Sequence, residues 1–267
     1  MFDFHNDRIL YYEQQQQNTK QYVIPYIQRS FALKPGMHVL EVGCGEGGVL
    51  KPFVEFGCIG TGVDPHKYRV DLAIEFMKED VEAGRAQFVT KSIYDDECRR
   101  EFKGMFDLIV LKDTLEHIPD QEQLIPLLRE YLAPRGVIFF AFPPWCMPFG
   151  GHQQMCSRKW LSMIPYFHLL PLPLYRGILK LAKEDPTIID ELENIYSTRI
   201  SLARFERILR ASRMIIISRL LYLINPNYQI KFNLTPREQP AVLRSIPYLR
   251  DFFTTTAFYI VGVDETV

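Results

Sequence analysis

A glycine-rich turn directly after a short apolar run is the feature that most restricts the fold of this chain. Residues 37–42 form the run, and Gly43, Gly45, Gly47 and Gly48 follow it. Glycine lets the backbone turn sharply at the end of a strand and lets a ligand approach the main chain. Doubly wound α/β sheets bind their ligands at this position, the carboxyl end of the first strand. The sequence therefore predicts a ligand-binding α/β fold.

Segments typical of strands and helices alternate along most of the chain. This alternation indicates βαβ units and a parallel sheet, and the continuous apolar runs suit strands that are covered on both faces. We predict an α/β, doubly wound, mostly parallel seven-stranded sheet. Its strands are expected at residues 37–42, 58–64, 86–90, 106–111, 137–142, 214–218 and 253–263.

The regular alternation stops at Phe142. The next stretch holds clustered prolines and both tryptophans, which favour irregular structure and short helices. We interpret it as a helical and irregular cap insertion. The expected organisation is an N-terminal helical segment at 1–36, a ligand-binding core at 37–142, the cap at 143–199 and a completion of the sheet at 200–267, with a second insertion at 225–251.

Charge and cysteine usage exclude some classes of protein. The net charge is −1 and the pI about 6.6, so the basic excess of most nucleic-acid-binding proteins is missing and no nucleic acid partner is expected. The five cysteines are odd in number and include no C-x-x-C pair, which predicts free thiols in a reducing compartment and no metal site.

The start of the chain lacks the charged-then-apolar order of a signal peptide. No uncharged apolar run approaches the roughly 18 residues that span a bilayer. We therefore expect a cytoplasmic protein without a transmembrane segment. Peripheral membrane contact and the oligomeric state stay open.

An acidic residue precedes the glycine turn and another closes the second expected strand. Glu41 lies two residues before Gly43, where its carboxylate suits a cationic ligand such as one with an ammonium and a sulfonium group, and repels a pyrophosphate. Asp64 is placed to accept hydrogen bonds from ribose hydroxyls. Gly43, Gly45 and Gly48 also satisfy G-x-G-x-x-G, so a dinucleotide site is the alternative.

Four segments together resemble the class I S-adenosylmethionine-dependent methyltransferases. VLEVGCGEGG at 39–48 resembles their motif I, and GTGVDP at 60–65 is similar to their acidic strand-end motif. FDLIVLKDTLEHI at 106–118 resembles the fourth-strand segment of the branch with the quinone-biosynthesis enzymes, and LAPRGV at 132–137 resembles the turn before the fifth strand, with Arg135 replacing a glycine. The resemblance covers residues 37–142, weakens afterwards, and implies a Rossmann-like methyltransferase fold.

The resemblance also implies which residues hold the cofactor, S-adenosyl-L-methionine. The glycine turn and the end of the fourth strand would take the methionine portion, Asp64 the ribose, and the loop after the third strand the adenine. Many family members carry an acid where this chain has Ser92, so Asp95 is the alternative adenine contact. The implied cofactor-binding residues are Glu41, Gly43, Cys44, Gly45, Gly47, Asp64, Pro65, Ser92, Ile93, Lys112, Asp113 and His117.

The N-terminal segment could also reach this cofactor. Tyr11, Tyr12, Gln15, Thr19 and Tyr22 precede the first strand, and related enzymes often lay such a segment over their ligand. We expect at least one of these side chains to touch it. The alternative is a helix that only covers the sheet.

Methyl transfer is an in-line displacement, so the protein mainly aligns the acceptor and excludes water. A general base can assist transfer to an oxygen acceptor, and whether one is used stays open. His117 and His152 are the candidates, with a structural or orienting role as the alternative. Trp145, Phe149 and His152 follow the fifth strand and are expected to bind the substrate, unless the cap packs its aromatic residues inward.

The acceptor itself stays undefined, and we expect a small molecule, lipid or glycan methylated at oxygen. The N/D-P-P-Y/F motif of enzymes that methylate amino groups is missing after the fourth strand, and Asn225-Pro226-Asn227-Tyr228 is interpreted as a turn. Apolar residues at 160–182 suggest a lipid-facing surface or a packed cap. A non-catalytic S-adenosylmethionine-binding protein and an NAD-binding oxidoreductase are the alternative functions.

Overall fold

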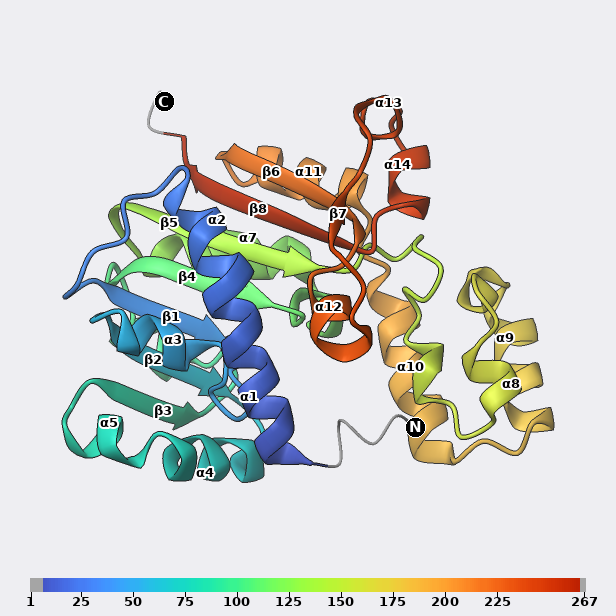
Figure 1. The fold of residues 1–267 in the computed structure, drawn as a ribbon, viewed down its shortest axis with the longest axis horizontal. Coiled ribbons are helices and arrows are strands. Elements are labelled where there is room, and N and C mark those ends of the chain that lie inside the picture. The colour runs from blue at the N-terminus through green and yellow to red at the C-terminus, as the bar shows by residue number, and fades with distance from the viewer. Residues whose placement is uncertain (1–6, 265–267) are drawn as a thin grey trace.

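The centre of the protein is an eight-stranded sheet with the order β3-β2-β1-β4-β5-β8-β6-β7 (Figure 1). The computed structural model describes residues 7–264, so the first six residues of the expected N-terminal segment lie outside it. Its strands are β1 (His38–Val42), β2 (Ile59–Asp64), β3 (Ala86–Thr90), β4 (Phe106–Lys112), β5 (Leu132–Phe142), β6 (Met214–Ile224), β7 (Arg237–Glu238) and β8 (Thr256–Val263).

The predicted doubly wound, mostly parallel sheet is confirmed. Strands β1 to β5 pair in parallel, and β8 runs antiparallel to both β5 and β6. The count of seven was wrong by one, because β7 contributes only Arg237 and Glu238 to the edge beside β6. A two-residue strand has no alternating pattern of its own, so only its partner reveals it.

Successive residues of each strand belong alternately to two separate hydrophobic layers, as the two-residue period of a strand requires. Val39, Val110 and Phe139 face one layer, which the N-terminal helices cover, whereas Leu40, Ile109 and Phe140 face the other. The flanking helices of the sheet are α1 (Arg8–Asn18), α2 (Ile24–Gln28), α3 (Leu50–Glu55), α4 (Lys67–Phe76), α5 (Lys78–Glu82), α6 (Asp96–Glu101), α7 (Gln121–Tyr131) and α11 (Leu202–Ala211).

Helices α1 and α2 form one continuous arm through a π-helical turn at Thr19–Val23. The side chain of Asp7 begins the arm by accepting a hydrogen bond from the Leu10 backbone nitrogen at 3.0 Å. Proline has no backbone N–H, so the wider turn just before Pro25 is a natural place for the hydrogen-bond ladder to change. The arm crosses the strands in front of the sheet (Figure 1).

Residues 143–199 pack around a hydrophobic cluster distinct from the two layers of the sheet. The segment contains α8 (Lys159–Ser162), α9 (Leu172–Leu181) and α10 (Pro186–Thr198). In Figure 1 these helices project beyond the carboxyl ends of the parallel strands. Helix α10 contacts the turn that follows β4.

Residues 225–251 contain α12 (Asn227–Phe232), α13 (Ala241–Arg244) and most of α14 (Leu249–Phe252). Helix α12 contacts α1, and the Tyr22 hydroxyl donates a hydrogen bond to Gln229. The arm and α12 therefore meet over the carboxyl edge of the sheet. Among residues 7–264, no helix combines the length and the apolar character that crossing a bilayer demands.

Candidate functional site

The turn after β1 adopts a backbone that favours glycine. Gly43, Gly45 and Gly47 have φ of 71°, 51° and 80°, in the left-handed region. A side chain on Gly43 would begin 2.4 Å from Thr114, whereas one on Gly45 would meet nothing within 4 Å. The turn is therefore packed against Thr114, after the end of β4, on one side and leaves open space on the other.

Asp64 links this turn to the end of β2. Its Oδ2 accepts a hydrogen bond from the Gly45 backbone nitrogen at 3.0 Å, and its Oδ1 accepts one from the His66 backbone nitrogen at 2.8 Å. The parallel pairing of β1 and β2 brings the two ends to the same edge. Pro65 and His66 are exposed beside the carboxylate.

Glu41 presents a carboxylate that the protein leaves incompletely paired. The side chain is buried, and within the described chain its Oε2 has no hydrogen-bond partner. Burial raises the pKa of Glu41 well above its ordinary value, and the nearby Lys112 ammonium only partly offsets this. A buried acceptor without a partner costs free energy unless a donor arrives, so this position suits a cationic group of a ligand.

Lys112 and Asp113 at the end of β4 join three parts of the chain. Lys112 Nζ donates to Gln15 Oε1 of the arm at 2.8 Å and to Asp113 Oδ2 at 2.7 Å. Asn227 Nδ2 of α12 donates to the same Asp113 oxygen at 3.3 Å. Burial opposes ionisation of Asp113, but Lys112, Lys231 and Asn227 together outweigh it and hold the pKa of that carboxyl below its usual value. Asp113 therefore stays charged and fastens α12 over the site.

The N-terminal arm lies directly on the glycine turn. A side chain on Gly48 would begin 2.8 Å from the Tyr12 carbonyl oxygen, and Arg8 pairs with Glu46 at 2.8 Å. Tyr11 accepts a hydrogen bond from Gln15, and burial raises its pKa to about 12. The arm is thus in place to cover a ligand, and contact with that ligand stays a prediction.

The loop after β3 lies at the same edge of the sheet. Ile93 is buried, and its carbonyl oxygen accepts a hydrogen bond from the Tyr131 hydroxyl at 3.0 Å. Asp95 accepts from the Ser92 backbone nitrogen at 2.9 Å. One carboxylate oxygen of Asp95 is therefore engaged within the loop, and the other would have to make any adenine contact.

His117 and His152 come together from different segments. His117 ends a 3-10 turn, Leu115–His117, that follows β4, and its ring centroid lies 4.9 Å from that of His152. Burial, followed by the charge of His117, lowers the pKa of His152 to about 3. His152 is therefore neutral at neutral pH, and its Nδ1 has no hydrogen-bond partner among residues 7–264.

Glu116, which the sequence did not single out, lies beside this histidine pair. It is buried, its Oε2 lacks a hydrogen-bond partner within the described residues, and its backbone oxygen accepts from Thr198 of α10 at 2.7 Å. Its place between Leu115 and His117 was visible in the sequence. The chemical role was not, because it depends on His152 arriving from another segment.

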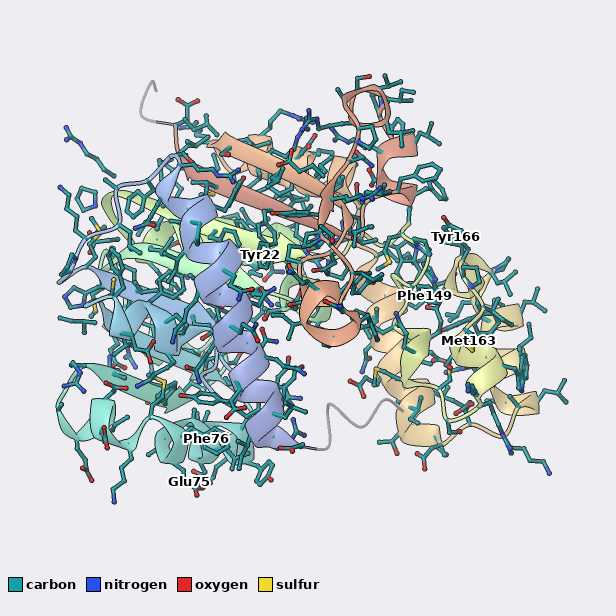
Figure 2. All side chains as sticks on the ribbon, viewed as in Figure 1. Tyr22, Glu75, Phe76, Phe149, Met163 and Tyr166 are labelled. Atoms are coloured by element: carbon teal, nitrogen blue, oxygen red, sulfur yellow. The ribbon has the colours of Figure 1, made fainter. Side chains whose placement is uncertain are left out.

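Trp145 and Phe149 are placed differently from each other. Trp145 is 9% exposed and packs edge-on against His168 and Tyr196, with ring centroids 4.6 and 5.3 Å away. Its carbonyl oxygen also lies 2.7 Å from His168 Nε2. These contacts put Trp145 inside the hydrophobic cluster of residues 143–199. Phe149 is half-buried in the loop before α8 (Figure 2).

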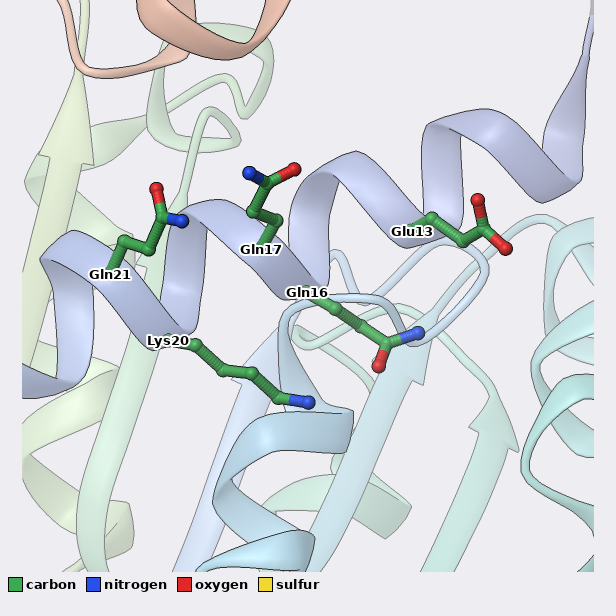
Figure 3. A pocket seen from close by; sticks show the side chains of 5 residues that line it. All are labelled: Glu13, Gln16, Gln17, Lys20 and Gln21. Carbon is green, nitrogen blue, oxygen red and sulfur yellow. The ribbon is translucent and has the colours of Figure 1, made fainter.

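Two surface hollows lie on the arm and away from the histidine pair. The first, of about 260 Å³, is a shallow polar groove on α1 and the π-helical turn (Figure 3). The second, of about 720 Å³, lies between the start of α1 and α4, where Figure 2 labels Glu75 and Phe76. The first is lined by Glu13, Gln16, Gln17, Lys20 and Gln21, and the second by Asp7, Arg8, Ile9, Tyr68, Leu72, Glu75 and Phe76.

Comparison with known proteins identifies the domain. The family described as "Methyltransferase domain" matches residues 12–171. The ubiquinone biosynthesis O-methyltransferase of Coxiella burnetii is 32% identical over 118 residues, which are 44% of this chain and 48% of that protein. A sterol 24-C-methyltransferase of Gibberella zeae is 30% identical over 124 residues, 46% of this chain and 31% of that protein. The chain thus matches about half the length, or less, of these curated relatives.

Solved structures share the fold over nearly the whole chain. Magnesium protoporphyrin IX methyltransferase from Synechocystis, solved with S-adenosylhomocysteine, has a TM-score of 0.53 at 14% identity and covers 96% of this chain and 87% of its own. Geranyl diphosphate C-methyltransferase from Streptomyces coelicolor has a TM-score of 0.54 at 12% identity, covering 92% and 79%. At these identities the likeness concerns the fold alone.

Proposed function

The chain belongs to the methyltransferase domain family, and from this premise we propose that it transfers the methyl group of S-adenosylmethionine to an oxygen atom of a small-molecule acceptor. The observation that carries the proposal is the buried carboxylate of Glu41, whose Oε2 has no hydrogen-bond partner among residues 7–264, beside an open glycine turn. A site built for a pyrophosphate would not place a carboxylate there. This separates the proposal from the NAD-binding alternative.

The residues present fit this cofactor. Glu41 can accept a hydrogen bond from its ammonium group, the open space at Gly45 admits it close to the backbone, and Asp64 stands where a ribose would lie. S-adenosylmethionine supplies a methyl group on a positively charged sulfur atom. The cofactor-binding residues proposed are those implied by the sequence, with Gln15 and Asn227 added as side chains that hold Lys112 and Asp113 in place.

The contribution of the chain to methyl transfer is alignment and exclusion of water. The arm and α12 meet over the carboxyl edge of the sheet and are tied to it through Lys112 and Asp113. Such closure strengthens electrostatic interactions inside the site and holds reacting atoms in line. We place the acceptor beside His117 and His152, which would contact its hydroxyl group.

The surface of residues 143–199 favours an apolar or lipid-type acceptor. Trp160, Met163, Leu174 and Leu181 are 57%, 63%, 52% and 84% exposed. Exposed apolar groups gathered in one region usually mark binding. Trp145 does not belong to this surface, because it is buried in the cluster beneath, and we propose a structural role for it.

Calorimetry with S-adenosylhomocysteine and with NAD tests the cofactor part. We expect saturable binding of the first and none of the second. Assays of methyl transfer to a panel of phenolic, sterol and prenylated acceptors then test the enzyme part. Binding without turnover of any acceptor would favour a non-catalytic cofactor-binding protein, and binding of NAD alone would contradict the proposal.

A further inference from the structure

The arm, the end of β4 and α12 are joined by hydrogen bonds into one polar frame over the carboxyl edge of the sheet. Gln15 of the arm accepts from Lys112 at 2.8 Å, and Lys112 donates to Asp113 at 2.7 Å. Asn227 of α12 donates to Asp113 at 3.3 Å. Helix α12 lies beside α1 (Figure 1), and Tyr22 of the arm donates a hydrogen bond to it. The polar frame therefore links three parts of the chain around one region.

Asn18 lies on the side of the arm that faces the polar frame. It follows Gln15 by three residues and precedes Tyr22 by four, and residues at this spacing share one face of a helix. The side chain is 1% exposed, and among residues 7–264 neither of its amide atoms has a hydrogen-bond partner. Buried polar groups are nearly always satisfied, so an amide with both atoms unpaired favours a ligand position.

Lys231 brings a positive charge to the polar frame from α12. It follows Asn227 by four residues, so the two side chains share one face of the helix. Lys231 is half-buried, and within the described chain its ammonium group forms no hydrogen bond or ion pair. Burial lowers the pKa of Lys231, the charge of Asp113 opposes this shift, and that of Lys112 adds to it. Because Lys112 already pairs with Asp113, one positive charge of the polar frame is left without a close counter-charge.

We propose that Lys231 and Asn18 bind a carboxylate group of a ligand held between α12 and the arm. The ammonium group of Lys231 supplies the charge, and the Asn18 Nδ2 atom supplies a second hydrogen-bond donor. A carboxylate suits this position better than a neutral group, because it compensates a half-buried cation that lacks a close partner. A lysine with no ligand to bind would keep its ammonium group in bulk water, as most surface lysines do.

Two ligands of the proposed function, on which this inference rests, can supply the carboxylate. The methionine portion of S-adenosylmethionine carries an ammonium and a carboxylate group, and Glu41 suits only the ammonium group. The acceptor is the second source, because the charge of Asp113 also raises the pKa values of His117 and His152, beside which the acceptor is proposed to lie. Both ligands thus adjoin the polar frame, and matched probes with and without a carboxylate distinguish them.

The cofactor source is tested by calorimetry with S-adenosylhomocysteine and with decarboxylated S-adenosylhomocysteine. If the cofactor supplies the carboxylate, Lys231→Met should weaken binding of the first about 10- to 150-fold, the range of a hydrogen bond to a charged group, and leave binding of the second unchanged. Lys231→Arg should keep most of the affinity, and Asn18→Ala should cause a smaller loss. Lys103→Met is the matched control, because Lys103 precedes β4 at the opposite edge of the sheet, and it should bind like wild type.

The acceptor source is tested by titrating the same variants with meta-hydroxybenzoate and with phenol, which differ by one carboxylate group. If the acceptor supplies the carboxylate, Lys231→Met should weaken binding of hydroxybenzoate alone and leave binding of S-adenosylhomocysteine unchanged. Circular dichroism identifies a variant that fails to fold, and Lys231→Gln then replaces Lys231→Met.

The outcomes separate the carboxylate site from the proposed function. Unchanged affinity of Lys231→Met for both carboxylate-bearing probes, or no binding of either probe to wild type, overturns the carboxylate site. If S-adenosylhomocysteine still binds in the first case, the proposed function stands. Binding of hydroxybenzoate that depends on Lys231, without binding of S-adenosylhomocysteine to wild type, supports the carboxylate site and overturns the proposed function.

Discussion

Residues 37–142 and residues 143–199 bury their apolar surface in different ways. The first region extends a sheet whose two faces share their hydrophobic layers with helices from many parts of the chain. The second region packs three short helices around its own cluster, which includes Trp145, Tyr175 and Leu192. One region is defined by regular pairing along strands, and the other by side-chain packing alone.

The difference also appears at the surface. The parallel strands are covered on both sides, whereas Trp160, Met163 and Leu181 of the second region are largely exposed. The regions meet where the Thr198 hydroxyl donates to the Glu116 carbonyl oxygen. Because the two regions have separate hydrophobic clusters, we expect the proposed acceptor region to be altered without loss of the proposed cofactor site. Four experiments test this division.

The largest effect should come from matched cavities in the two regions. Phe140→Ala removes a ring of β5 that packs against Phe205 of α11. This variant should lower the free energy of unfolding by about 3–5 kcal/mol and weaken cofactor binding. Leu192→Ala, in the cluster of residues 143–199, should cost about 2–5 kcal/mol locally but leave cofactor affinity close to wild type. Denaturant unfolding and calorimetry check both. If Leu192→Ala abolishes cofactor binding, the two regions form a single cooperative unit.

The histidine pair spans both regions, so its removal should separate turnover from cofactor binding. With an acceptor that wild type methylates, we expect His152→Ala to lower kcat by about 10²–10⁴-fold, the usual contribution of a residue that assists proton removal. Affinity for S-adenosylhomocysteine should stay within a factor of about two, because Glu41 and Asp64 are untouched. Single-turnover kinetics measure the first and calorimetry the second. Normal turnover in this variant would exclude His152 from the reaction.

Asp64 belongs to the first region alone. Asp64→Ala should weaken binding of S-adenosylmethionine and its demethylated product by about 1.5–3 kcal/mol, the scale of hydrogen bonds to a charged group. Asp71→Ala is the control, since Asp71 forms an exposed ion pair with Lys67 on α4. Calorimetry compares the two variants. Unchanged affinity in Asp64→Ala would mean that the ribose lies elsewhere.

The smallest effect concerns the acid sensitivity of the second region. Glu184 accepts hydrogen bonds from the Ser157 hydroxyl and from the Ser157 and Arg158 backbone nitrogens, at 2.7–3.0 Å. Burial opposes ionisation of Glu184, but these hydrogen bonds outweigh it and lower its pKa. The resulting stability is present above the unfolded pKa of about 4.3 and is lost as the pH falls through the lower folded value.

Glu184→Gln should therefore cost about 1 kcal/mol at neutral pH, and the difference from wild type should shrink below about pH 4. Urea unfolding at a series of pH values measures it. Lys91 and Glu97 form an exposed pair on the sheet side, and Glu97→Gln serves as the control with little effect. A difference for Glu184→Gln that grows in acid would contradict the assignment.

The hydrophobic pattern predicted residues 37–142 well, because each strand and the glycine turn are marked by residues that lie close together in the sequence. The strand from residue 106 and the glycine turn each carry their pattern within a few residues, and Glu41 and Asp64 follow from the positions of strand ends. The same reasoning placed β6 at 214–218, although it continues to Ile224, since its later residues are ordered by pairing with β8. Patterns do not report partners that are distant in sequence.

The positions of Asn227 and Trp145 depended on such partners, which are distant in sequence. Residues 225–228 do form the expected turn, with the Tyr228 backbone nitrogen donating to the Asn225 carbonyl oxygen at 2.8 Å. Nothing in that tetrapeptide indicates that Asn227 reaches Asp113. Trp145 shows the opposite problem, because an aromatic residue after β5 is equally suited to line a pocket or to fill a core, and only the position of His168 and Tyr196 distinguishes the two.

The position of β8 has a consequence for synthesis of the protein. This strand lies between β5 and β6, yet it begins at Thr256, long after β5 ends at Phe142. During translation the hydrogen-bonding edge of β5 therefore stays without its neighbour while residues 143–255 emerge. Unpaired strand edges and exposed apolar surface make nascent chains prone to aggregation. Residues 143–199 pack around their own cluster, so they can condense during this interval, whereas the edge of β5 waits for Thr256–Val263.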